Sequence, residues 1–207
     1  MEEIMNIGSN LSSSFAYAKD GLVGQWVKWI LLIISAIIFP LLMGYQLRVM
    51  RGESPAPEVG NWGKTFIDGI LYLIIAIIYA IPVIIVSTIF TTIALSTGNA
   101  ALALVGTLLT VIIAIAISLI ELIGIVNFAR KESIGAAFAI GDILAKIGEI
   151  GWISLLIQLI VLEIVLGVIY FVLMLIPIVG MLLLLILCPL FAIWEAKYIS
   201  NVYDNAQ

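Results

Sequence analysis

The chain has 207 residues, of which 64% are hydrophobic and only 11% are charged, and its formal net charge is −4. A soluble domain is about a quarter charged, so this composition excludes a water-exposed globule and predicts an all-α, polytopic membrane protein surrounded by the lipid bilayer. The scarcity of basic residues excludes nucleic-acid binding, and the absence of histidine together with a single cysteine, Cys188, excludes a cysteine-based zinc site and an intrachain disulfide.

Three segments are predicted along the chain. Residues 1–25 form an N-terminal tail that is partly interfacial; it is acidic at its start and lacks the long apolar run of a cleavable signal peptide. Residues 26–194 form a single transmembrane helical domain. Residues 195–207 form a C-terminal tail.

About five apolar runs are long enough to cross a hydrocarbon core of about 30 Å, which takes roughly 20 helical residues. Short polar or proline-containing turns separate the second run from the third and the fourth from the fifth. The predicted spans are residues 26–45, 70–93, 101–126, 153–173 and 178–194.

Lysine and arginine residues determine the predicted orientation, because cytoplasmic loops carry an excess of them. Lys19 and Lys28 lie before or at the start of the first span. The other basic residues fall after the first, third and fifth spans: Arg48, Arg51, Lys64, Arg130, Lys131, Lys146 and Lys197. This distribution predicts a multi-pass protein of the cell membrane with its N-terminus outside and its C-terminus in the cytoplasm. The alternative is a re-entrant helix at Pro40, which would leave the N-terminus inside.

The second cytoplasmic connection carries an amphipathic pattern. Apolar residues recur at helical spacing across residues 134–150, while Asp142, Lys146 and Glu149 share the other face. This pattern predicts an interfacial helix that lies in the membrane plane.

Polar residues within the apolar runs predict an intramembrane polar site. Glu163 lies about 15 Å inside its run, near the membrane midplane, and Glu121 lies closer to the inner end of its own run. Ser118 belongs to a stripe of small and polar residues on the third run, and Tyr170 shares a face with Glu163. A carboxyl group at such depth is costly and faces a partner, a cavity or the bundle interior. The four residues either form a proton or cation pathway or hydrogen-bond neighbouring helices as neutral groups.

The first cytoplasmic connection, residues 46–69, predicts a second candidate surface. Arg48, Arg51, Trp62 and Asp68 have the chemistry to bind a lipid headgroup or a cytoplasmic partner. Ordinary anchoring at the membrane interface explains the same residues.

Several motifs resemble an uncharacterised prokaryotic membrane family catalogued as domain of unknown function 4013. The similarity extends over nearly the whole chain from about Ser14, and the first cytoplasmic connection is its most specific part. The motifs are Gly44-Tyr45-x-x-Arg48-x-x-Arg51-Gly52-Glu53, Pro57, Trp62, Phe66-x-Asp68-Gly69, Tyr79-x-x-Pro82, Ala136-Ala137-Phe138 with Gly141, and Pro177-x-x-Gly180. The resemblance implies a small multi-helix membrane protein, often archaeal, and implies no particular activity.

The residues favour a non-catalytic role. No G-x-S-x-G or H-E-x-x-H motif occurs, and no cofactor is expected. The simplest expectation is a membrane scaffold or accessory subunit that contacts other membrane proteins or itself. The alternative is a small transporter or channel subunit that uses Glu163 and Glu121.

Overall fold

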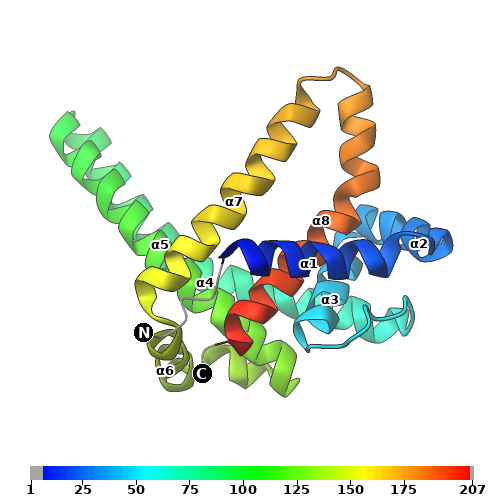
Figure 1. The fold of residues 1–207 in the computed structure, drawn as a ribbon. Coiled ribbons are helices and arrows are strands. Elements are labelled where there is room, and N and C mark those ends of the chain that lie inside the picture. The colour runs from blue at the N-terminus through cyan, green and yellow to red at the C-terminus, as the bar shows by residue number, and fades with distance from the viewer. Residues whose placement is uncertain (1–6, 206–207) are drawn as a thin grey trace.

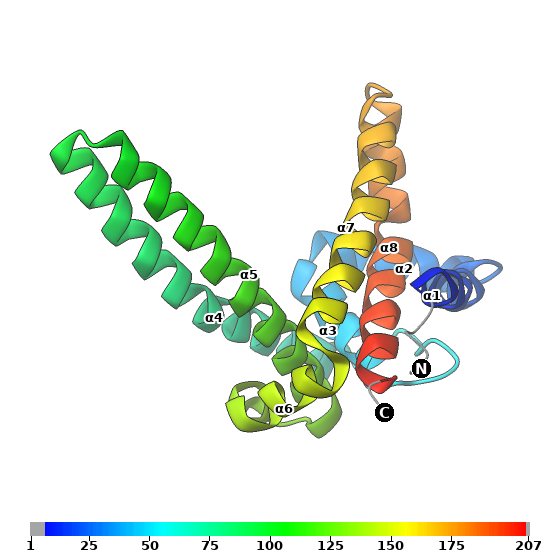
Figure 2. The ribbon, with the colours of Figure 1, turned by 60° about the vertical axis from the view of Figure 1, so that its left-hand side comes forward.

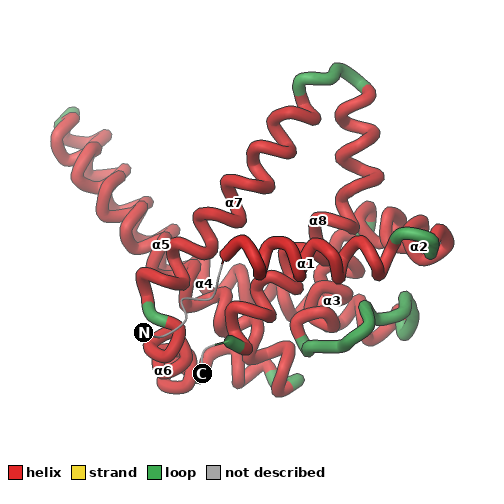
Figure 3. The backbone as a smooth tube through the Cα atoms, in the orientation of Figure 1, coloured by secondary structure: helices red, strands yellow, loops and turns green. Residues whose placement is uncertain are grey.

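The computed structural model describes residues 7–205, and all regular elements in that range are helices (Figures 1 and 3). The predicted all-α class is therefore confirmed. The elements are α1 (Ile7–Leu22), α2 (Trp26–Ile37), α3 (Phe39–Met50), α4 (Trp62–Thr97), α5 (Ala100–Lys131), the 3-10 helix η1 (Ile134–Phe138), α6 (Ile140–Ile150), α7 (Trp152–Met174) and α8 (Val179–Asp204).

Within residues 7–205, the helices α4, α5, α7 and α8 are each long and apolar enough to cross a membrane. A fifth span results only if α1 and α2 are counted together, and these two helices are bent by 106° at the break between them. The chain is thus a polytopic membrane protein with four to five candidate spans, as its composition predicted.

The four long helices form two hairpins, α4–α5 and α7–α8, which leave a common base in different directions (Figures 1 and 2). We define the base as residues 7–79, 119–155 and 190–205. Helix contacts inside the base join α3 to α4, α1 to α8 and α5 to α6. Most large side chains without solvent access belong to it, including Leu47, Ile75, Ile123 and Ile147.

Local chemistry explains the tight turn of the first hairpin. Gly98 ends α4 with a φ of 62°, a left-handed conformation that glycine adopts without a steric penalty. Asn99 caps α5, since its side chain accepts hydrogen bonds from the backbone N–H groups of Ala101 and Leu102 at 3.0 and 3.2 Å. The polar turn predicted between the second and third spans is confirmed.

The first predicted span, residues 26–45, is not one helix. It is divided between α2 and α3, which meet at Ile38. Pro40 lies in the first turn of α3, where its missing N–H is tolerated, whereas a continuous helix would lose a hydrogen bond and meet the proline ring at that point. At about 1.5 Å per residue, neither 12-residue piece crosses about 30 Å of hydrocarbon alone.

The amphipathic connection is also divided. η1 ends at Phe138 and α6 begins at Ile140. In η1, the backbone carbonyl of Ala137 accepts a hydrogen bond from the Tyr79 hydroxyl at 2.6 Å. Tyr79 also stacks on Phe138, with ring centroids 5.5 Å apart. α6 buries Ile143 and Ile147, so its amphipathic character is confirmed while its start moves to Ile140.

The last helix is longer than predicted. The expected span ended at residue 194, but α8 continues to Asp204, and its final turns bury Tyr198, Ile199 and Val202. Pro189 is accommodated inside this helix. α1 packs on this extension: the Trp194 indole N–H donates to the carbonyl of Leu11 at 3.0 Å.

Candidate functional site

A cavity of about 510 Å³ lies between α5, α7 and α8. Its polar residues are Ser118, Glu163 and Glu195, one from each helix, and its other lining residues are leucines and isoleucines. In a chain this apolar, a pocket that gathers two carboxyl groups and a hydroxyl is the strongest candidate for a binding site.

Glu163 stands at the middle of α7, about 16 Å from either end at 1.5 Å per residue. Glu163 is exposed at the surface of the chain, and the other residues around it in the cavity lining are mostly leucine and isoleucine. Within residues 7–205, neither Glu163 nor Glu195 takes part in an ion pair. Placing an ionisable side chain near the middle of a membrane helix costs free energy when the side chain has no ion-pair partner.

Glu195 reaches the same cavity from α8. The antiparallel packing of α7 on α8 sets this register, since Tyr170 meets Phe191 with ring centroids 5.3 Å apart and the Tyr198 hydroxyl donates to the carbonyl of Gln158 at 3.2 Å. Gln46 of α3 reaches the same stretch of α8, where its side-chain amide donates to the carbonyl of Ala192 at 3.2 Å. Glu195 is partly buried where α8 meets the base, whereas Glu163 is exposed.

The structure divides the predicted intramembrane site into two parts. Ser118 and Glu163 line the cavity, and Tyr170 lies further along α7 against Phe191. Glu121, about one turn further along α5 than Ser118, does not line the cavity.

Glu195 was not among the predicted site residues. The sequence interpretation ended the last span at residue 194 and assigned Glu195 to the C-terminal tail. A signal for the longer helix was present, because apolar residues continue at helical spacing through Tyr198, Ile199 and Val202 without a proline or glycine.

The four residues predicted for a cytoplasmic interface lie in the base. Arg51 donates to Asp68 at 2.7 Å and Arg48 lies 3.3 Å from Glu53, so the charges of both arginines are paired inside the chain. Trp62 begins α4 with its side chain 40% exposed. The role of these residues as an interface stays a prediction.

Arg51 and Asp68 belong to a cluster of four charges, which we call the ion cluster: Arg51, Asp68, Lys64 and Glu132. Lys64 donates to Glu132 at 2.6 Å, and Arg51 lies 3.5 Å from the same carboxylate. The Lys64 hydrogen bond, followed by the charge of Arg51, holds the pKa of the Glu132 carboxyl below its ordinary value. The ion cluster joins the end of α3 to α4 and to the end of α5.

No group of three or more histidine, cysteine, aspartate or glutamate side chains gathers in the part of the chain that the structure describes. What the cavity offers is a pair of carboxyl groups and one hydroxyl in apolar surroundings, which suits a cationic or hydrogen-bond-donating group carried on an apolar body.

Comparison with known proteins supports the resemblance found in the motifs. No curated protein and no solved structure matches the chain. The family described as "Protein of unknown function (DUF4013)" matches residues 29–178, from α2 to the turn before α8, so the match includes Ser118 and Glu163 and excludes Glu195. The match begins later than the similarity from about Ser14 that the motifs suggested. Because it covers well over half of the 207 residues, the chain belongs to the DUF4013 family.

Proposed function

We propose that this protein is a membrane scaffold or accessory subunit, which binds another membrane protein in the cavity between α5, α7 and α8. The observation that carries the proposal is Glu163, a carboxyl group at the middle of α7 that is exposed to a cavity lined by leucine and isoleucine. Hydrocarbon chains offer such a group no hydrogen bond, whereas a protein segment does. The proposed role is non-catalytic.

The arrangement of the two hairpins supports this role. They diverge from the base (Figure 2). Exposed apolar side chains of α5 and α7 line the cavity, for example Ile115 and Ile160. A transmembrane helix of another protein is the kind of occupant that has apolar side chains for these walls and satisfied backbone groups of its own.

Site-specific photo-crosslinking in native membranes tests the proposal. A photoreactive residue at Ile160, in the cavity wall, is expected to give one protein adduct of defined mass. The same residue at Ile84, an exposed position of α4 outside the cavity lining, serves as the control. Lipid adducts alone at Ile160, or the same protein adducts from both positions, would contradict the proposal.

A small transporter or channel subunit is the second candidate. It is favoured by the meeting of Glu163, Glu195 and Ser118 in one cavity, which is the chemistry of a proton or cation site. Glu121, which the sequence assigned to the same pathway, does not line this cavity. A pH-driven flux into vesicles that contain the purified protein, lost in Glu163→Gln, would favour this candidate over the first.

We further propose that the N-terminus and the C-terminus share the cytoplasmic side, which is the second of the two orientations that the sequence left open. The packing of α1 on the last turns of α8 supports it: Asn10 donates to the carbonyl of Tyr198 at 3.3 Å, and Asn201 donates to Asn10 at 2.8 Å. Lys28 of α2 reaches the first cytoplasmic connection, where it donates to the carbonyl of Ala56 at 2.9 Å.

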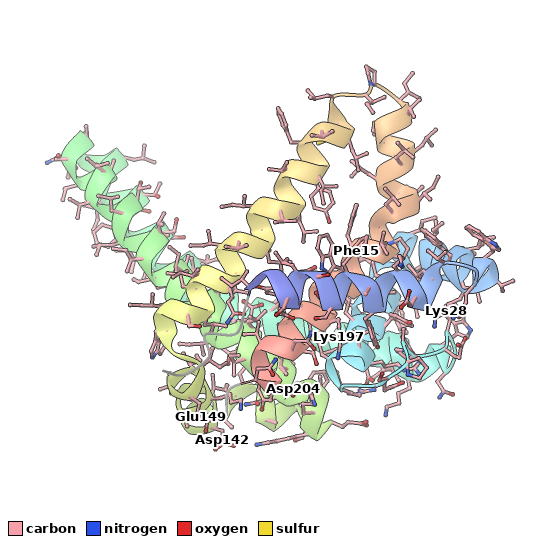
Figure 4. The ribbon with its side chains drawn as sticks, viewed as in Figure 1. Phe15, Lys28, Asp142, Glu149, Lys197 and Asp204 are labelled. Atoms are coloured by element: carbon pink, nitrogen blue, oxygen red, sulfur yellow. The ribbon has the colours of Figure 1, made fainter. Side chains whose placement is uncertain are left out.

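The distribution of charge supports the same orientation. Lys28, Lys197, Asp142, Glu149 and Asp204 all lie at the base, away from the tips of both hairpins (Figure 4). Because α1 and α2 belong to the base, the 9 lysine and arginine residues fall on one side of the membrane, which the positive-inside rule assigns to the cytoplasm.

A further inference from the structure

The two carboxyl groups of the cavity differ in their surroundings. Glu195 is partly buried on α8. Glu163 is exposed toward the cavity, and no ion pair within residues 7–205 includes it. The cavity is therefore lined by two carboxyl groups that form no ion pair with a lysine or arginine of the described chain.

A cation in the cavity would interact with both carboxyl groups. Two carboxylates that line one apolar cavity disfavour each other's ionisation, and a positive charge placed between them removes this penalty. Among protein groups, lysine and arginine combine a cationic head with a long aliphatic stem. Such a stem would pack on the leucine and isoleucine walls while the head reaches the glutamates.

The chain itself is not the source of this cation. Its transmembrane helices carry lysine and arginine only near the base, at Lys64, Arg130, Lys131 and Lys197, whereas Glu163 lies at the middle of α7. These basic residues are engaged elsewhere: Lys64 pairs with Glu132, Arg130 with Asp204 and Lys131 with Asp142, and the Lys197 ammonium lies over the Tyr17 ring. We therefore look for the complementary charge on a different protein.

We propose that the occupant of the cavity is a transmembrane helix of another protein that presents a lysine or arginine side chain to Glu163 and Glu195. This inference rests on the proposed function and adds the chemistry of the partner. The apolar part of that helix lies between α5 and α7, and its basic side chain extends toward α8.

Synthetic transmembrane peptides test the charge requirement without knowledge of the natural partner. The probes are poly-leucine helices of about 21 residues, flanked by lysines for insertion, with lysine, leucine or glutamate at the central position. Full-length protein with Cys188→Ala and a fluorophore on a cysteine introduced at Ser96, in the α4–α5 turn, is reconstituted in vesicles with each labelled peptide. Energy transfer between the labels reports association.

The central-lysine peptide is expected to associate at least about tenfold more tightly than the central-leucine peptide, as a charge-assisted contact in an apolar site allows. Glu163→Gln and Glu195→Gln should each reduce this preference, and the control Glu121→Gln, which changes a residue outside the cavity lining, should retain it. The comparison of the peptides uses the unaltered cavity, so it does not depend on whether the variants fold.

Equal association of the lysine and leucine peptides, or a lysine preference that survives both Glu163→Gln and Glu195→Gln, would overturn the inference. A protein adduct at Ile160 in native membranes would still support the scaffold role in that case. If Ile160 gives no protein adduct but the central-lysine peptide still associates preferentially, the scaffold role is wrong and the charge preference of the cavity stands.

Discussion

The guanidinium of Arg51 donates to the carboxylate of Asp68 at 2.7 Å and thereby joins the C-terminus of α3 to the second turn of α4. The two side chains are only 14% and 11% exposed, so this ion pair is largely shielded from water. Arg51 also donates to the carbonyl of Ala129 at 3.2 Å, which extends the connection to the end of α5.

Asp68→Ala should destabilise the protein by about 3 kcal/mol, because it leaves the charge of Arg51 inside the base without its closest counterion. Unfolding in detergent, followed by the loss of helical circular dichroism, measures the change. Lys131→Ala is the matched control: its ion pair with Asp142 is 52% and 62% exposed, so the loss should be clearly smaller. Equal losses in the two variants would show that burial of the Arg51–Asp68 pair is not what stabilises the base.

Gly44→Ala should destabilise the packing of α3 on α4 by about 1–3 kcal/mol. A Cβ atom at Gly44 would overlap the backbone carbonyl of Thr65, and one at Gly69 would overlap the carbonyl of Pro40, so neither helix has room to accept it. Gly63→Ala, with nothing within 4 Å of its added Cβ, is the control and should be neutral or slightly stabilising. Thermal unfolding midpoints in one detergent compare the variants, and a Gly44→Ala protein as stable as the Gly63→Ala protein would contradict the close approach.

The stability of the ion cluster should depend on pH through Glu132. The hydrogen bond from Lys64 and the charge of Arg51 lower the pKa of this carboxyl in the folded protein from its ordinary value of 4.5. The contribution of Glu132 is therefore complete above the unfolded pKa and is lost as the pH falls through the lower folded pKa. Unfolding midpoints of the natural protein and of Glu132→Gln, measured from pH 7 downward, should differ most at neutral pH and converge in acid. A constant difference across this range would exclude Glu132 as the titrating group.

The proposed orientation predicts which cysteines an impermeant thiol reagent reaches in intact cells. In a Cys188→Ala background, a cysteine at Ser12 in α1 should be protected in the same way as one at Asn205, after α8. A cysteine at Ser96, in the turn between α4 and α5, should react. Reaction at Ser12 with protection at Asn205 would support the other orientation, with the N-terminus outside.

Part of this architecture follows from local sequence. The apolar runs at residues 70–93, 101–126 and 153–173 lie inside α4, α5 and α7. The predicted polar turn at residues 96–99 includes the end of α4 and the two residues that connect it to α5. The sequence predicts such features because, in lipid, each apolar segment has to form its backbone hydrogen bonds within a helix. The family resemblance could be recognised as well, since each of its motifs is a short local stretch of the chain.

Other features depended on contacts between distant residues. The break at Ile38 places α3 against α4 and α8, and the hydropathy of residues 26–45 contains no information about that packing. The extension of α8 to Asp204 is buried by α1, which lies at the opposite end of the chain.

The sequence by itself determined that this chain is a helical membrane protein and that a few carboxyl groups lie within its apolar helices. Only the tertiary structure decided which of them meet: Glu163 shares a cavity with Glu195, and Glu121 does not line that cavity. The physical reason is that hydropathy is a property of each segment alone. The rotation and register of one helix on another are set by side-chain packing between segments far apart in the chain.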